Sequence, residues 1–218
     1  APMQGLLDPV MRRLLTDIGG YNECVTEFVR ITHTVHSRVT WLRHVPEIAR
    51  QNRTPSGIPC TTQLLGSDAD MMAKNALEAV RLGVQTIDLN FGCPAPTVNK
   101  HQGGAILLRE PERIRRIVAT VRQRLPENIP LTAKMRLGYE DGSRALECAQ
   151  AIAQGGASAL AVHARTKIEG YRPPAHWEQI APIRQALSIP VIANGDVFSL
   201  TDYLAIRRTS GCQDVMLG

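Results

Sequence analysis

The fold prediction starts from residues 86–94, Thr-Ile-Asp-Leu-Asn-Phe-Gly-Cys-Pro, where an apolar strand ends abruptly in a Gly-Cys-Pro turn. Pro94 cannot donate to a strand ladder, so the strand stops and the Cys93 thiol is presented at its carboxyl end. Gly92 permits a close approach of the backbone, and Asn90 supplies an amide that can hold a polar ring edge. Most free cysteines are small buried hydrophobes. These neighbours instead favour a thiol that acts on a ligand.

Strand-like and helix-like runs alternate on both sides of this stretch. The clearest helix covers residues 111–125, where the apolar positions share one face, and two further helices are predicted over 68–82 and 143–154. Alternation with short connections predicts parallel strands joined by helical crossovers. The predicted strands cover residues 24–30, 59–66, 86–93, 131–138, 159–166, 190–196 and 214–218.

Polar residues recur at the carboxyl ends of the predicted strands, and this placement favours a closed barrel over an open sheet. In a (β/α)8 barrel these ends all open on one face, where barrel enzymes keep their active sites. No G-x-G-x-x-G sequence opens a helix, which removes the main signature of the open dinucleotide-binding fold. The prediction is therefore an α/β protein with a (β/α)8 TIM barrel. The polar residues are Gln63, Asn90, Cys93, Lys134, Arg136, His163, Arg165, Asn194 and Asp196.

The two ends of the sequence predict a barrel truncated at both ends. Ala1-Pro2-Met3 is typical of the last residues of a strand whose apolar beginning is missing, and Gly218 ends a strand that no helix follows. We expect residues 1–218 to form one catalytic domain. It would lack the start of its first strand and the segment beyond the eighth.

Composition narrows the class of protein. With 218 residues, 44% of them hydrophobic, the chain can bury one sizeable core. The five cysteines show no C-x-x-C spacing and no leader opens the chain, which predicts reduced thiols in the cytoplasm. No apolar run approaches the roughly 20 residues of a membrane-spanning helix. His33 and His36 stand three apart without a third ligand, so no metal site is predicted.

The net charge of +5 is compatible with a polyanionic partner such as nucleic acid. Many of the basic residues lie on the predicted helix 111–125, however, and a solvated outer face explains them equally well. Both interpretations stay open at this point.

The polar cluster around the thiol suits a planar cofactor whose ring carries carbonyl and N–H groups along one edge, and flavin fits that description. Lys134 can stabilise negative charge on a reduced flavin. Asn194-Gly195-Asp196 lies where barrels commonly bind a phosphate.

Six segments of the chain together resemble the tRNA-dihydrouridine synthase family in order and spacing. Residues 26–30 and the loop 166–172 are most similar to the bacterial C-type enzyme, which modifies uridine 16 of the tRNA D-loop. The six segments are Ala1-Pro2-Met3, Gln63-Leu64-Leu65-Gly66, Asn90-Phe91-Gly92-Cys93-Pro94, Lys134-Met135-Arg136, His163-Ala164-Arg165-Thr166 and Asn194-Gly195-Asp196.

The resemblance implies a set of site residues and partners. It implies FMN as cofactor, NADPH as reductant, tRNA as substrate, and a helical tRNA-binding domain after the barrel; we expect a monomer. Cys93 would be the catalytic residue. Substrate contacts would come from Asn90, Arg136, Arg165 and Tyr171. Cofactor contacts would come from Pro2, Met3, Gln63, Lys134, His163, Asn194, Gly195, Asp196 and Gly218.

The implied reaction is reduction of the uracil C5=C6 bond, in which Cys93 gives a proton to C5. An ordinary thiol, with a pKa of about 8.5, is mostly protonated at neutral pH and can act as this general acid. Two alternatives stay open. One is a flavin barrel that reduces a free pyrimidine or another small unsaturated substrate; the other is a non-catalytic RNA-binding domain in which Cys93 is inert.

Overall fold

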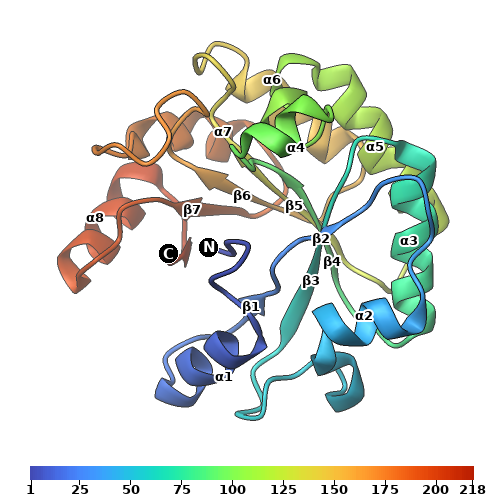
Figure 1. Cartoon of the computed structure of the whole chain (residues 1–218). Coiled ribbons are helices and arrows are strands. Elements are labelled where there is room, and N and C mark those ends of the chain that lie inside the picture. The colour runs from blue at the N-terminus through green and yellow to red at the C-terminus, as the bar shows by residue number, and fades with distance from the viewer.

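The computed structural model describes residues 1–218. Its parallel strands follow one another in chain order, β1-β3-β4-β5-β6-β7-β8, with β2 also paired to β3, and the sheet curls around a common interior (Figure 1). The prediction of a parallel βα barrel is confirmed. The strands are β1 (Cys24–Val25), β2 (Val29–Arg30), β3 (Cys60–Leu65), β4 (Ile87–Phe91), β5 (Leu131–Arg136), β6 (Ala159–His163), β7 (Val191–Asn194) and β8 (Asp214–Met216).

Helices cover the outside of the curled sheet (Figure 1). The three predicted helices are present with ends shifted by at most two residues, and no helix is long and apolar enough to cross a membrane. The α-helices are α1 (Pro9–Ile18), α2 (Arg38–His44), α3 (Ala69–Arg81), α4 (Pro96–Lys100), α5 (Pro111–Arg124), α6 (Ala145–Gln154), α7 (Ile180–Ala186) and α8 (Leu200–Ser210). Three short 3₁₀ helices are η1 (Pro46–Arg50), η2 (Gly104–Arg109) and η3 (Trp177–Gln179).

The β4 strand shows how the sequence separates the core from the site. Successive side chains of a strand point to opposite faces. Ile87, Leu89 and Phe91 belong to the main apolar core, which packs between sheet and helices. Asp88 and Asn90 alternate with them and therefore lie on the inner face of the curled sheet. On β4, the face toward the barrel interior is thus polar, and the face toward the surrounding helices is apolar.

The run 24–30 differs from the prediction of one continuous strand. Val25 pairs with Thr61 and Val29 pairs with Leu64, so four steps along this run match three along β3. The extra residue is a bulge. Beside it the Thr26 hydroxyl accepts a hydrogen bond from the backbone N–H of Gln63 at 3.0 Å. The run is therefore divided into β1 and β2.

The first three residues also differ from the prediction, because Ala1–Met3 form no strand. The Ala1 amino group instead donates to the carbonyl of Leu217, just after β8. The two ends of the chain consequently lie side by side at the edge of the curled sheet (Figure 1).

Candidate active site

Strand register gathers the predicted site residues on one side of the sheet. Asn90 on β4 lies opposite Lys134 on β5. His163 on β6 lies opposite both Arg136 on β5 and Asn194 on β7. Residues opposite each other on parallel strands share a face, so these side chains line the carboxyl end of the barrel interior.

The Asn90 side chain shapes the turn that presents the thiol. Its Oδ1 accepts hydrogen bonds from the backbone N–H groups of Gly92 and Cys93, each at 2.9 Å. Its Nδ2 donates to Oε1 of Gln63 at 2.8 Å. Most of the amide is therefore engaged within the protein. The structure thus gives Asn90 a turn-holding contact, and its predicted substrate contact stays a prediction.

Further contacts fix the position of Cys93. The Cys93 carbonyl accepts from the backbone N–H of Ala105 at 3.1 Å and from Nδ2 of Asn99 at 3.0 Å. A Cβ on Gly92 would lie 3.3 Å from the carbonyl carbon of Met135, so glycine allows β4 and β5 to approach here. Burial raises the pKa of the half-buried Cys93 thiol, which is thus protonated at neutral pH.

Lys134 is a buried amine without a carboxylate partner in hydrogen-bond contact. Its Nζ donates to Oδ1 of Asn194 at 2.9 Å. Burial lowers the pKa of Lys134 to about 7; Arg136 acts in the same direction and Asp88 opposes it. An ammonium group has three N–H donors, so two remain for a ligand. Such a group favours a carbonyl or a negative charge beside it.

Arg136 connects the Cys93 turn to the loop that follows β6. Its Nε donates to the Gly92 carbonyl at 3.0 Å, and its Nη1 donates to the carbonyls of Thr166 and Gly170 at 2.9 and 2.8 Å. The guanidinium carbon lies 5.1 Å from the ring centre of Tyr171. Arg136 therefore holds the Tyr171 loop against the Cys93 turn, and Tyr171 itself is 59% exposed.

Arg165 joins β6 to the turn after β7. It forms an ion pair with Asp196, and its Nη1 lies 3.3 Å from Nε2 of His163. Its buried Nε has no hydrogen-bond partner. Burial holds the pKa of His163 far below its ordinary value, so that ring is neutral. Gly195 has a φ of 126° and a Cβ there would lie 3.1 Å from the His163 ring, so glycine is required at this close approach.

The two chain ends border this group of residues. Pro2 is half-buried and Met3 is exposed. Asn194 reaches across to the end of the chain, where its Nδ2 donates to the Gly218 carbonyl at 3.2 Å. Gly218 has a φ of 102°, and a Cβ on it would collide with the Ala1 amino group. These predicted residues thus lie on the β8 side of the interior.

Sequence reasoning missed Asp88, a carboxylate inside the barrel. Its Oδ1 accepts from the Thr132 hydroxyl at 2.6 Å and its Oδ2 from Nε2 of Gln63 at 2.8 Å. Burial raises the pKa of Asp88 to about 6. The available signal was a charged residue two positions before Asn90 in an otherwise apolar strand, which places both on the inner face.

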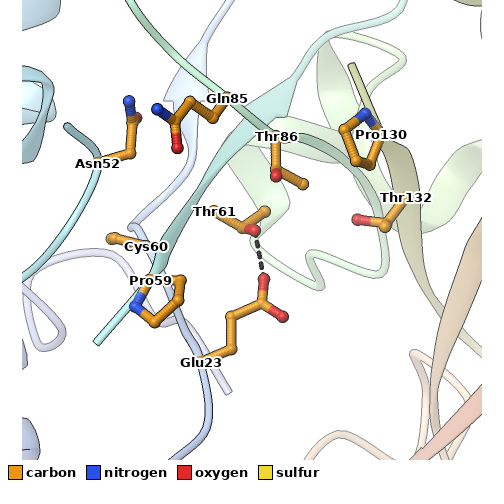
Figure 2. A pocket seen from close by; sticks show the side chains of 9 residues that line it. All are labelled: Glu23, Asn52, Pro59, Cys60, Thr61, Gln85, Thr86, Pro130 and Thr132. Atoms are coloured by element: carbon orange, nitrogen blue, oxygen red, sulfur yellow. Dashed lines mark hydrogen bonds between the residues drawn. The ribbon is translucent and has the colours of Figure 1, made fainter. Parts of the chain in front are cut away.

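A separate pocket of about 250 Å³ opens at the opposite end of the barrel (Figure 2). Pro59, Thr86 and Pro130 line it from the amino ends of three strands, and Glu23 accepts a hydrogen bond from Thr61 across it. None of the predicted site residues lines this pocket. Barrel enzymes have their active sites at the carboxyl ends of the strands. We therefore assign the chemistry to that end, which carries Cys93 and is called the Cys93 face below.

The Cys93 face combines a protonated thiol, a buried lysine amine with free N–H donors, a neutral imidazole and an unpartnered guanidinium N–H. This donor set fits a planar ligand with hydrogen-bond acceptors along one edge and a negative charge. It offers no ring of carboxylates for a cationic ligand.

Comparison with known proteins identifies relatives along the whole chain. The relatives include tRNA-dihydrouridine(16) synthase of Neisseria meningitidis serogroup A, at 74% identity over 100% of this chain and 66% of that protein. The same-named protein of Aquipseudomonas alcaligenes is 52% identical over 100% of this chain and 69% of its own length. The chain thus spans about two thirds of the curated relatives' length.

A solved structure of histamine dehydrogenase from Rhizobium sp. 4-9 shares the fold, with a TM-score of 0.69 and 16% identity over 99% of this chain and 42% of that one. A solved structure of phosphonopyruvate hydrolase gives a TM-score of 0.64 and 13% identity, covering 97% of this chain and 72% of that one. The family described as dihydrouridine synthase matches residues 1–218. The resemblance noted in the sequence is confirmed, and the chain belongs to the dihydrouridine synthase family.

Proposed function

We propose that the protein reduces the C5=C6 bond of uridine 16 in the tRNA D-loop, with FMN as cofactor and NADPH as electron donor. The observation that carries the proposal is the Cys93 thiol, whose turn is held by Asn90 at the carboxyl end of the barrel, on the inner face that also carries the buried Lys134 side chain. Family membership and the names of the relatives support the reaction and the position. A reaction on tRNA places the protein in the cytoplasm.

The residues present fit a flavin. The two remaining Nζ hydrogens of Lys134 would meet a ring carbonyl or a negatively charged ring nitrogen, and neutral His163 can share a hydrogen with a ring atom or the ribityl chain. The unpartnered N–H of Arg165 and the turn at Gly195 suit an anionic group. When bound, the flavin reduced by NADPH supplies a hydride to C6 of the uracil.

Cys93 supplies the proton at C5. A thiol can act as this acid without adding positive charge to the site, and burial keeps it protonated because it raises the pKa. The bonds from Asn90 to the Gly92 and Cys93 N–H groups hold the turn in one conformation. Proton transfer therefore starts from a fixed donor, which reduces the orientational cost of the step.

The uridine must leave its stack in folded tRNA, at a cost on the order of a few kcal/mol. Tyr171 offers an exposed aromatic ring at the edge of the site, 6.3 Å from the His163 ring centre. Stacking of the extruded base on such a ring is worth about 1–3 kcal/mol. This contact would offset much of the unstacking cost.

The test is a set of single-turnover assays on the full-length protein. Purified protein should show a flavin absorption band, and NADPH-reduced protein should be reoxidised by unmodified tRNA. Mapping the product should place dihydrouridine at position 16, and tRNA with cytidine at that position should fail as substrate. Reoxidation by free uridine at the same rate would instead identify a small-molecule reductase, and a colourless protein that binds tRNA would identify a binding domain.

A further inference from the structure

We propose that Asp88 is a positioning residue that fixes the orientation of the Gln63 and Asn90 side-chain amides and thereby holds the turn that carries Cys93. The inference deepens the proposed function, because it concerns the same thiol. It rests on a continuous series of hydrogen bonds inside the barrel, from β5 through β4 and β3 back to the end of β4.

The series begins with a group that can only accept. Asp88 is buried, 5% exposed, between the Thr132 hydroxyl at 2.6 Å and the Gln63 amide at 2.8 Å. An ionised carboxylate has no hydrogen to donate. Whatever faces it must therefore present an N–H or O–H.

This requirement selects one of the two orientations of the Gln63 amide. A side-chain amide has an oxygen at one end and an NH₂ at the other, with nearly the same shape. Only the NH₂ end can face Asp88, so the oxygen of Gln63 must face Asn90. Its Oε1 is then the acceptor for Nδ2 of Asn90 at 2.8 Å.

The orientation of the Gln63 amide fixes that of the Asn90 amide, which in turn contacts the Cys93 turn. With Nδ2 directed at Gln63, the Asn90 oxygen faces two backbone donors, the N–H groups of Gly92 and Cys93 at 2.9 Å each. The reverse orientation would place an NH₂ against both N–H groups, and two half-buried donors would lose their acceptor. One carboxylate thus determines both amides.

The series transmits orientation and does not relay protons, because an amide hydrogen is not readily given up at neutral pH. The charged groups near Asp88 are Lys134 on β5, which favours its ionised form, and Glu23 before β1, which opposes it. Neither is in hydrogen-bond contact with Gln63 or Asn90. The orientation therefore depends on the carboxylate oxygen that faces Gln63.

The test compares three variants of the full-length flavin-bound protein. Asp88→Leu removes the acceptor and keeps the same number of side-chain heavy atoms, branched at the same carbon. Asp88→Asn retains it, because its amide oxygen can face Gln63 while its NH₂ faces the Thr132 hydroxyl. Thr132→Val is the matched control, since it removes a hydrogen bond from the far side of the carboxylate and leaves the Gln63 contact.

The main readout is amide hydrogen exchange in the segment containing Gly92 and Cys93, supported by the rate at which iodoacetamide alkylates Cys93. Loss of a buried hydrogen-bond acceptor should accelerate exchange there about tenfold in Asp88→Leu. Asp88→Asn and Thr132→Val should stay within about twofold of the wild-type protein by the same reasoning. If Asp88→Leu does not fold, Gln63→Met interrupts the series at the next position and should give the same acceleration.

Wild-type exchange in both Asp88→Leu and Gln63→Met would overturn the inference. So would equal acceleration in Thr132→Val, because that result would indicate general loosening of the barrel. These outcomes are separate from the proposed reaction, since exchange is measured without tRNA. Failure of the proposed function would instead appear as undiminished uridine reduction in a protein that lacks the Cys93 thiol.

Discussion

In the proposed reaction the Cys93 thiol supplies one proton, so its removal should separate two half-reactions. Cys93→Ala should retain flavin and accept electrons from NADPH, because the thiol serves only the protonation at C5. Reoxidation by tRNA should slow by roughly 10²–10⁴-fold, the usual contribution of a general acid. Rapid-mixing absorbance of the flavin measures both steps in the same sample, and near-wild-type reoxidation would contradict the assignment.

The same thiol predicts a pH profile. Burial raises the pKa of Cys93, and the protonated form is the acid, so activity from this group is present below that pKa and is lost as the pH rises through it. The tRNA-dependent step should therefore be level through neutral pH and fall only at alkaline pH. A decrease between pH 6 and 8 would show that a group other than this thiol, such as Lys134 or a different acid, controls the step.

Lys134 should impose its own pH dependence on stability in flavin-free protein. Its folded pKa of about 7 lies below the ordinary value near 10.4, so the unfolded chain binds more protons between these values. Stability should thus rise with pH above about 7, by at most about 1.4 kcal/mol per pH unit. Urea unfolding at pH 7 and 8 tests this, because Lys134→Met should lack that rise. An equal change of unfolding free energy between pH 7 and 8 in both proteins would contradict this role of Lys134.

At the scale of elements, the contact between α5 and α6 depends on a glycine for space. A Cβ on Gly155 would lie 2.7 Å from Cβ of Val118, although its φ of −69° is ordinary. Gly155→Ala should lower the free energy of unfolding by about 1–3 kcal/mol through overpacking. Gly103→Ala is the control, since its new contacts begin at 3.4 Å. Equal effects of the two substitutions on urea unfolding would refute the explanation.

The spacing of apolar residues predicted most helices and strands well, because each element carries this spacing within its own sequence. It failed at residues 24–30, where every residue is compatible with a strand and the bulge follows only from pairing with β3. It also failed at Ala1–Met3, which form no strand. Both errors concern pairing between segments, on which the sequence of one segment carries no direct information.

In the molecule as a whole, barrel topology explains why so many of the predicted site residues lie together on one face. Polar residues at strand ends share one face by construction. Their individual contacts could not be predicted, because these depend on register. Arg136 binds backbone carbonyls and Asn90 holds the turn. Asp88 was missed because its partners Gln63 and Thr132 come from two other strands.

The structure also bears on whether the basic residues of α5 bind nucleic acid or form a solvated outer face. Arg115 is paired with Glu112 and Arg113 with Glu110, both on the outer wall of the barrel. Arg122 donates to backbone carbonyls beyond the helix end, including that of Ile129 at 2.7 Å. These contacts favour the outer-face interpretation. A tRNA-binding surface is better sought at the carboxyl end, where Lys167 and exposed Arg172 belong to the same loop as Tyr171.

The location of charge, more than its total, should therefore decide tRNA affinity. Each phosphate contact adds about 0.7–0.9 to the slope of log affinity against log salt. Replacing Lys167 and Arg172 with Gln in the full-length protein should weaken binding and reduce that slope by about one to two. The same change at Arg115 and Arg116 removes two charges from α5 and should leave the slope unaltered. Titration of labelled tRNA at several salt concentrations measures both pairs, and equal losses would mean that the protein's overall field governs binding.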